Sequence, residues 1–136
     1  MHKKVQVIII STLESPHLLL LKTNPKRGSF WQNVTGSVEK NEDFLHAAKR
    51  ELQEETGICD AELEKLDYSF TFKSPLHKKD VLEQAFLAKI KNRPQIILDG
   101  KEHEDFAWIE LNAITRENYK YESNFIAFQK SLLLLN

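Results

Sequence analysis

The first third of the chain alternates short apolar runs with polar segments that contain turn residues. Residues 5–11 form a nearly continuous, β-branched run, and residues 18–21 form a second one. Apolar runs of this length are typical of buried strands, and the Glu-Ser-Pro segment at residues 14–16 lies between the two. The pattern predicts two strands that pair as a hairpin, followed by a loop over residues 22–28.

A helix is predicted over residues 42–56, where Ala, Leu, Glu, Gln, Lys and Arg are frequent. Asn41 is expected to cap its first turn, and Gly57 is expected to end it in the left-handed conformation. Apolar positions recur at spacings of one, three and four, which favours one buried face. The residues expected on that inward face are Phe44, Leu45, Ala48 and Leu52.

Strand-like patterns dominate the second half of the chain. Alternating or apolar segments predict strands at residues 59–64, 66–72, 81–90, 95–98 and 106–110. Residues 74–80 are expected to form a loop with a basic tip. From about residue 117 a helix is predicted, with Phe125, Phe128 and Leu132 on one side.

Length and charge limit the classes of protein that fit. With 136 residues the chain is one domain's worth, long enough to bury a substantial core. Its 19 basic and 20 acidic side chains leave a formal charge of −1, whereas proteins that coat nucleic acids or membranes usually carry a basic excess. No apolar stretch approaches the ~20 residues that span a bilayer. We therefore expect no stable nucleic-acid or membrane partner.

The cysteine content and the N-terminus both favour a cytoplasmic protein. The single cysteine, Cys59, cannot form an internal disulfide and is expected to be a small core residue. Lys3 and Lys4 precede an apolar run, as in a secretory signal, but the run ends too soon and no small-residue cleavage site follows. The start of the chain is therefore interpreted as a strand.

Three glutamates crowd one turn of the predicted helix. Glu51, Glu54 and Glu55 fall at i, i+3 and i+4, so they project from one side. Arg50 can meet Glu54 at i+4, which leaves two carboxylates without a positive partner on the helix. Hard oxygen ligands on a rigid element suit Mg²⁺ or Mn²⁺. A solvated acidic helix face is the alternative that this spacing alone leaves open.

The residues around these glutamates narrow the choice. The fixed positions are Gly36, Glu42, Arg50-Glu51, Glu54-Glu55 and Gly57, followed by apolar Ile58. This segment resembles the Nudix box, with no position missing. The resemblance implies an α/β Nudix fold, a mixed β-sheet sandwiched between α-helices, in a single domain over residues 1–136. It also implies hydrolysis, dependent on Mg²⁺ or Mn²⁺, of a nucleoside diphosphate linked to another group X.

The same resemblance assigns roles residue by residue. The expected metal ligands are Glu51, Glu54, Glu55 and the Gly36 carbonyl. Arg50 is expected to hold a glutamate in place by a charge-assisted bond. Glu102 stands in a Glu-His pair six residues before Trp108 and is the candidate general base. With Glu54, Glu55 and Arg50 it completes the expected catalytic set. A solvated acidic loop at residues 102–105 is the alternative, and His103 is expected to be structural.

The segment before the box points to a substrate class. Residues 30–39 resemble the entry to the box in the dihydroneopterin triphosphate and dATP pyrophosphohydrolase group, and they lack the Pro-Lys-Gly or Pro-Gln-Gly lead-in typical of dinucleoside polyphosphate and RNA 5′-pyrophosphate hydrolases. The resemblance implies a purine nucleoside or pterin triphosphate, split into a monophosphate and pyrophosphate. The expected substrate contacts are Lys22, Arg27, Lys73, Phe30 and Trp31. Ordinary loop charge and core packing are the alternatives for these side chains.

Two other functions stay open. One is a Nudix hydrolase of nucleoside diphosphate sugars or other dinucleotide-type diphosphates, which would release no pyrophosphate. The other is a non-catalytic nucleotide-binding module, which would be expected to have lost box glutamates that this chain keeps. The expected partner is in each case a small nucleotide-like molecule. A monomer and a homodimer both fit, because the leucine run at residues 132–135 suits a core or an interface equally.

Overall fold

The apolar runs at the start of the chain form an antiparallel hairpin, as predicted, in a computed structural model that describes residues 1–76 and 78–135. Its strands are β1 (His2–Ser11) and β2 (His17–Thr23). The other strands are β3 (Trp31–Gln32), β4 (Val34–Ser37), β5 (Glu62–Ser74), β6 (Lys79–Ile90) and β7 (His103–Glu110).

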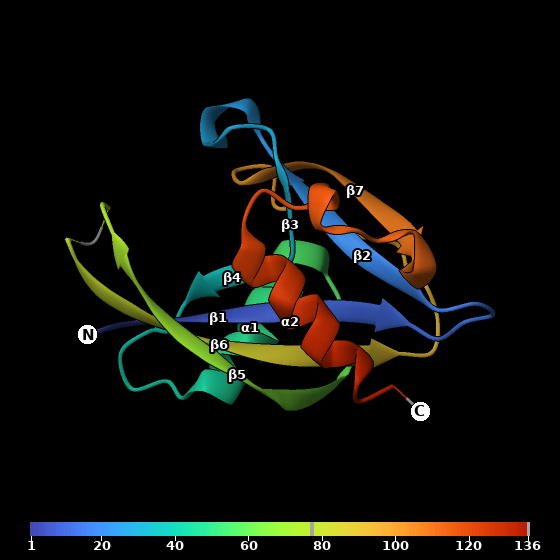
Figure 1. Ribbon diagram of the computed structural model, residues 1–136, viewed down its shortest axis with the longest axis horizontal. Coiled ribbons are helices and arrows are strands. Elements are labelled where there is room, and N and C mark those ends of the chain that lie inside the picture. The colour runs from blue at the N-terminus through green and yellow to red at the C-terminus, as the bar shows by residue number, and fades with distance from the viewer. Residues whose placement is uncertain (77, 136) are drawn as a thin grey trace.

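These strands form one mixed sheet between two helices, α1 (Phe44–Thr56) and α2 (Glu122–Leu132) (Figure 1). The strand order is β3-β2-β1-β6-β5, with β4 paired to β1 and β7 paired to β2. β1 and β6 run parallel, and the other pairs are antiparallel. The expected α/β architecture, a mixed sheet sandwiched between helices, is confirmed.

β1 is apolar on both faces because each face is covered by a helix. Val7 and Ile9 pack in one cluster with Ala48 of α1, whereas Ile8 packs in a second cluster with Phe128 of α2. Successive side chains of a strand point to opposite faces, so a strand covered on both sides needs an unbroken apolar run. These three β1 side chains are at most 1% exposed.

α1 begins two residues later than the sequence predicts. Its cap is Asp43, whose carboxylate accepts a backbone hydrogen bond from the first turn, and not Asn41, which has a left-handed φ of 67° in the preceding turn. Gly57 ends the helix with a φ of 80°, as predicted. The expectation that Leu45 faces the core is wrong, since Leu45 is 40% exposed. Ala47 is fully buried instead, on the buried face of the helix that also carries two of the box glutamates.

One long strand, β5, stands where two strands were expected at residues 59–64 and 66–72. It pairs with β6 on both sides of an irregularity between Lys65 and Ser69, where the pairing register shifts and the alternation of the sequence breaks. Gln84 of β6 satisfies a backbone acceptor at this irregularity, because its side-chain amide donates a hydrogen bond to the Leu66 carbonyl at 2.8 Å. β5 therefore continues through a position where the sequence pattern predicts a boundary between two strands.

Two expectations about the connecting segments are also corrected. Cys59 is exposed and not a core residue, because it lies in the connection between α1 and β5. Residues 95–98 form no strand. Their backbone bonds to the end of α1 instead, where the Ile97 N–H donates to the Thr56 carbonyl at 2.9 Å, and Ile96 packs into the α1-side core.

The remaining differences concern where elements begin. The loop expected at residues 74–80 is shorter, because both of its ends pair in the β5–β6 hairpin; position 77 of this loop lies outside the described residues. Near residue 117 there is only a short 3-10 turn, Arg116–Asn118, and α2 starts after it. β7 starts before the strand that was expected at residues 106–110. In the described ranges no helix is long and apolar enough to cross a membrane.

Candidate functional site

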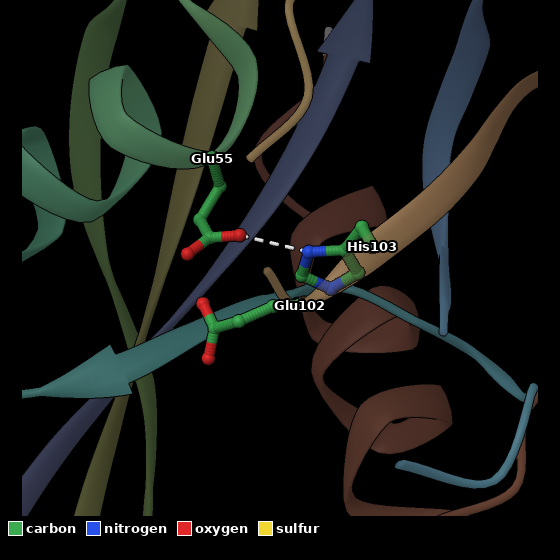
Figure 2. Close-up of side chains that lie close together, drawn as sticks. All are labelled: Glu55, Glu102 and His103. Carbon is green, nitrogen blue, oxygen red and sulfur yellow. Dashed lines mark ion pairs between the residues drawn. The ribbon is translucent and has the colours of Figure 1, made fainter. Parts of the chain in front are cut away.

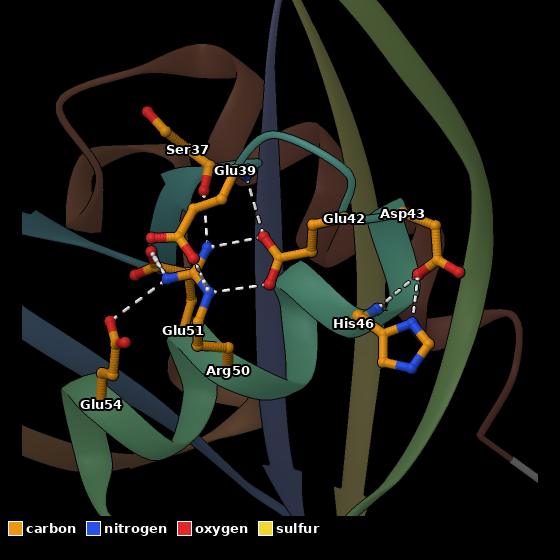
Figure 3. Close-up of polar contacts among 8 residues, drawn as sticks. All are labelled: Ser37, Glu39, Glu42, Asp43, His46, Arg50, Glu51 and Glu54. Atoms are coloured by element: carbon orange, nitrogen blue, oxygen red, sulfur yellow. Dashed lines mark hydrogen bonds and ion pairs between the residues drawn. The ribbon is translucent and has the colours of Figure 1, made fainter.

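Arg50 organises the first part of the glutamate cluster (Figure 3). Its Nε and Nη2 donate to the two carboxylate oxygens of Glu42 at 2.8 and 2.9 Å, and Nη2 also donates to the Ser37 carbonyl at 2.8 Å. Its Nη1 donates to Glu51 at 2.8 Å and to Glu54 at 3.3 Å. The guanidinium therefore ties α1 to the loop before it and holds two of the three clustered glutamates by charge-assisted bonds.

Gly36 lies directly against the carboxyl group of Glu51. A Cβ at this position would collide with the Cδ and Oε1 atoms of Glu51, so glycine is required for this close approach. The backbone of Gly36 is fixed in β4, which pairs with β1 at Val5. Gly36 therefore lies against one of the carboxylates that are expected to share a metal ion with its carbonyl.

Glu55 meets two residues from the second half of the chain (Figure 2). Its Oε2 lies 2.8 Å from His103 Nδ1, and both side chains are at most 2% exposed. Glu102, which immediately precedes β7, places a carboxylate oxygen within 4.8 Å of ligand atoms on both side chains. Among the described residues, neither Glu55 Oε2 nor His103 Nδ1 has a hydrogen-bond partner. The two atoms are thus in contact without forming a hydrogen bond.

Gln32 of β3 holds the other side of the His103 ring. Its Nε2 lies 3.0 Å from His103 Nε2. In this orientation the amide NH₂ donates, so His103 Nε2 accepts and the ring proton is on Nδ1, beside Glu55. Burial lowers the pKa of His103, which favours the neutral imidazole.

The carboxylate cluster is electrostatically unfavourable without a cation. Burial raises the pKa of Glu55, and the neighbouring carboxylates of Glu102 and Glu51 raise it further. Burial also raises the pKa of Glu51, against the lowering effect of Arg50. Arg50 pairs with Glu51 and Arg27 pairs with Glu102, so Glu55 has no guanidinium partner among the described residues.

These groups fit a divalent cation. Glu55 offers a buried oxygen that no described residue satisfies, and Glu51 and Glu102 add carboxylate oxygens beside it. Hard oxygen donors of this kind suit Mg²⁺ or Mn²⁺. Glu54 is the outermost of the three helix glutamates, with a side chain 54% exposed and turned toward Arg50.

A cleft of about 540 Å³ opens next to the cluster, on the α2 side of the sheet. Its walls carry the aromatic rings of Phe30, Phe70, Phe72 and Tyr121. Two residues that line the cleft also contact residues of the cluster. Arg27 lines the cleft and donates to Glu102 at 2.8 Å, while Gln32 lines it and contacts His103. Arg27 and Gln32 therefore connect the cleft to the cluster.

The structure separates the five residues expected to contact a substrate. Arg27, Phe30 and Lys73 line the cleft. Trp31 packs against the α2-side core, and Lys22 forms an ion pair at 3.5 Å with an acidic residue of β7. Neither Trp31 nor Lys22 is among the described residues that line the cleft.

Several site groups have no catalytic or binding role in the sequence-based assignment. Glu42 is a fixed position of the box, but it precedes the helix and lies eight residues before Arg50, so helix spacing does not pair them. Gln32 reaches the cluster only because β3 and β7 both pair with β2. The one sequence signal for His103 is the Glu-His pair that also contains Glu102.

Known proteins resemble the chain in sequence and in fold. An octanoyltransferase from Myxococcus xanthus is 38% identical over 96 residues, which cover 69% of this chain and 26% of that protein. An RNA pyrophosphohydrolase from Pelagibacter ubique is 32% identical over 100 residues, which cover 64% of this chain and 63% of that protein. The chain thus spans less than two thirds of either relative. The structure of the E. coli dihydroneopterin triphosphate pyrophosphohydrolase matches with a TM-score of 0.82 and 25% identity, covering 98% of this chain and 96% of that one.

The family model described as the NUDIX domain matches residues 2–128. This range contains the whole box, the Glu102-His103 pair and every described residue that lines the cleft. The match covers nearly the whole chain, and the fold agrees with it. The chain belongs to the Nudix family.

Proposed function

We propose that this protein is a pyrophosphohydrolase, dependent on Mg²⁺ or Mn²⁺, that splits a nucleoside or pterin triphosphate into a monophosphate and pyrophosphate. The observation that carries the proposal is the continuity of cleft and cluster, since Arg27 lines the cleft and holds Glu102 beside Glu55. A ring bound between the aromatic side chains would extend its phosphates toward the carboxylates. The similarity to a dihydroneopterin triphosphate pyrophosphohydrolase supports this choice of substrate.

The proposed metal ligands are Glu51, Glu54, Glu55 and the Gly36 carbonyl. A bound divalent cation neutralises charge on phosphate oxygens and lowers the pKa of a coordinated water. Arg50 acts through the ligands, because its Nη1 bonds to Glu51 and Glu54 hold both carboxylates in place. The contact with Gly36 fixes the Glu51 carboxyl group from the opposite side.

Glu102 is the proposed general base. Its carboxylate lies beside Glu55 and opens onto the cleft through Arg27, so it can take a proton from a water that attacks a phosphate there. Arg27 and Lys73 line the cleft as cations and are proposed to bind phosphate oxygens. Phe30 is proposed to contact the ring. Most of the rate enhancement would come from positioning and charge stabilisation.

The proposal is tested with a substrate panel whose products are identified. The purified protein is incubated with Mg²⁺ or Mn²⁺ and nucleoside triphosphates, neopterin triphosphate, nucleoside diphosphate sugars or dinucleoside polyphosphates. Ion-exchange chromatography should show a monophosphate and pyrophosphate from a triphosphate. The Glu55→Gln variant, purified in parallel, controls for a contaminating phosphatase.

Two other results of the substrate panel would contradict the proposed pyrophosphohydrolase activity. Turnover of diphosphate sugars or dinucleotides without pyrophosphate would assign the protein to that class of Nudix hydrolase. No turnover of any substrate with either metal would overturn the hydrolase proposal and favour a nucleotide-binding module.

A further inference from the structure

Glu83 lies in the cleft and has no part in the proposed hydrolysis. It belongs to β6, where the strand register places it beside Lys4 of β1 and Phe70 of β5, and all three residues line the cleft. Glu83 is only 4% exposed. Among the described residues only Gln6 donates a hydrogen bond to this carboxylate, from Nε2 to Oε2 at 2.9 Å. A carboxylate with so little exposure and one such donor is stabilised when further donors reach it from the cleft.

The groups behind Glu83 are locked in one orientation. Gln6 Oε1 accepts a hydrogen bond from Asn33 Nδ2 at 2.7 Å, so Gln6 turns its NH₂ group toward Glu83. Asn33 Oδ1 accepts from the Tyr119 hydroxyl at 2.9 Å, and the Asn33 backbone N–H donates to Asn124 Oδ1 at 2.9 Å. Gln6, Asn33, Tyr119 and Asn124 are at most 4% exposed. The carboxylate is therefore presented to the cleft as a fixed hydrogen-bond acceptor.

Aromatic rings line the cleft that contains this acceptor. Phe70 stacks on Phe72 along β5 with a centroid distance of 5.9 Å. Phe30 and Tyr121 form an edge-to-face pair with centroids 5.4 Å apart, and both line the same cleft. Figure 1 shows β5 and β6 running on beyond α2, so the helix does not cover this hairpin along its full length. Such walls suit a flat heterocycle.

We propose that Glu83 determines ring specificity by accepting hydrogen bonds from a ring N–H and an adjacent exocyclic NH₂ group. Guanine and pterin (2-amino-4-oxopteridine) rings carry this donor pair, whereas adenine, cytosine, uracil and hypoxanthine lack it. The inference rests on the proposed function for the placement of phosphates at the glutamates. It narrows the substrate class to rings with this edge.

The charge on Glu83 favours such a ring. Burial raises the pKa of Glu83, and the charge of Lys4 and the hydrogen bond from Gln6 only partly oppose this shift. Two N–H donors would stabilise the ionised carboxylate. A ring acceptor at the same place would face carboxylate lone pairs, and a ring without the amino group would leave an acceptor unsatisfied. Each loss is expected to weaken binding at least tenfold, on the order of 1.4 kcal/mol or more.

The test measures binding, so that it does not depend on turnover. Isothermal titration calorimetry with Mg²⁺ compares the α,β-methylene analogues of GTP and ITP, whose rings differ only by the exocyclic amino group. The wild-type protein should bind the GTP analogue at least tenfold more tightly. Glu83→Gln should lose this difference, and Glu64→Gln, an exposed residue of β5 outside the cleft, should keep it.

The outcomes separate this inference from the proposed function. Equal affinities of the wild-type protein for the two analogues, or no binding of either, would overturn the inference even if Glu83→Gln does not fold. A folded Glu83→Gln variant that keeps the full preference would also overturn it. A wild-type protein that prefers the GTP analogue but hydrolyses nothing in the substrate panel would leave the inference standing and overturn the proposed pyrophosphohydrolase activity.

Discussion

Glu42, in the loop before α1, and Arg50, within α1, form a bidentate ion pair, with Nε–Oε2 and Nη2–Oε1 distances of 2.8 and 2.9 Å. Oε1 of Glu42 also accepts a hydrogen bond from the backbone N–H of Glu39 at 2.9 Å. One carboxylate therefore joins the loop before the helix to the guanidinium that holds Glu51. We therefore propose that Glu42 positions the proposed metal ligands and is not one of them.

Replacing Glu42 with Gln should lower kcat and weaken activation by Mg²⁺, because Arg50 would lose its main acceptor. The pair is partly buried, with side chains 23% and 14% exposed, and its loss should reduce the free energy of unfolding by about 1–3 kcal/mol. Urea unfolding and Mg²⁺ titration of the rate measure both effects. Glu39→Gln is the matched control, since Glu39 is 67% exposed and lies 3.4 Å from Arg50, so it should change stability by less than about 0.5 kcal/mol. Equal effects of the two variants would contradict the positioning role.

Sequence reasoning succeeds where the interactions are local. The spacing of Glu51, Glu54 and Glu55 predicts one carboxylate-rich side of a helix, and the predicted contact of Arg50 with Glu54 at i+4 is present at 3.3 Å. Gly57 ends that helix because a left-handed residue is needed immediately after it. Each of these features depends on residues within two turns of one another.

Long-range pairing accounts for most of what the sequence does not reveal. Glu83 meets Gln6 only because β1 and β6 are parallel neighbours, although the two residues are 77 positions apart. His103 meets Glu55 because β7 pairs with β2 next to the end of α1, and no local pattern encodes that contact. Strand order is set by the whole sheet, so these partners appear only with the fold.

Gly36→Ala should lower kcat strongly while the protein stays folded. The added Cβ would collide with the Glu51 carboxyl group, which would have to leave its position between Gly36 and Arg50. Gly100→Ala is the control, because a Cβ there has no atom within 4 Å. Steady-state kinetics and thermal unfolding of both variants provide the measurement. A Gly36→Ala enzyme as active as Gly100→Ala would show that the Glu51 position is unimportant.

Glu55→Gln should reduce kcat by on the order of 10²-fold or more, because it removes the charge of a proposed metal ligand and no core contact. Its stability should be unchanged or higher, since a buried carboxylate among other carboxylates is replaced by a neutral isostere. Gln53→Ala, on the exposed side of the same helix, should keep normal kcat. Near-normal activity of Glu55→Gln would remove Glu55 from the metal site.

Glu102→Gln should lower kcat and change the acidic limb of the pH–rate profile, as expected for loss of a general base. Glu102 also holds Arg27 at 2.8 Å, so Arg27→Gln is needed as a partner experiment. Arg27→Gln should raise KM through lost phosphate binding and leave the shape of the kcat profile intact. If the two variants behave alike, Glu102 acts by positioning Arg27 and is not the base.

Glu83→Gln should stabilise the protein at neutral pH relative to the wild type. Burial raises the pKa of Glu83 above its ordinary value of 4.5, so the folded chain binds this proton more tightly than the unfolded chain. The contribution of Glu83 to stability is therefore greatest below pH 4.5 and is lost as the pH rises through the folded pKa. Gln cannot titrate, so the stability of the variant relative to the wild type should increase with pH across this window and then level off.

Lys4 on β1 and Tyr68 on β5 are charged or titratable neighbours of Glu83. Both remain in the variant, so the wild-type and Glu83→Gln proteins differ only in the carboxylate. Urea unfolding of the two proteins from about pH 4 to pH 8 gives the difference in the free energy of unfolding. A difference that stays constant with pH, or that falls as the pH rises, would show that Glu83 is not a carboxyl group destabilised by burial.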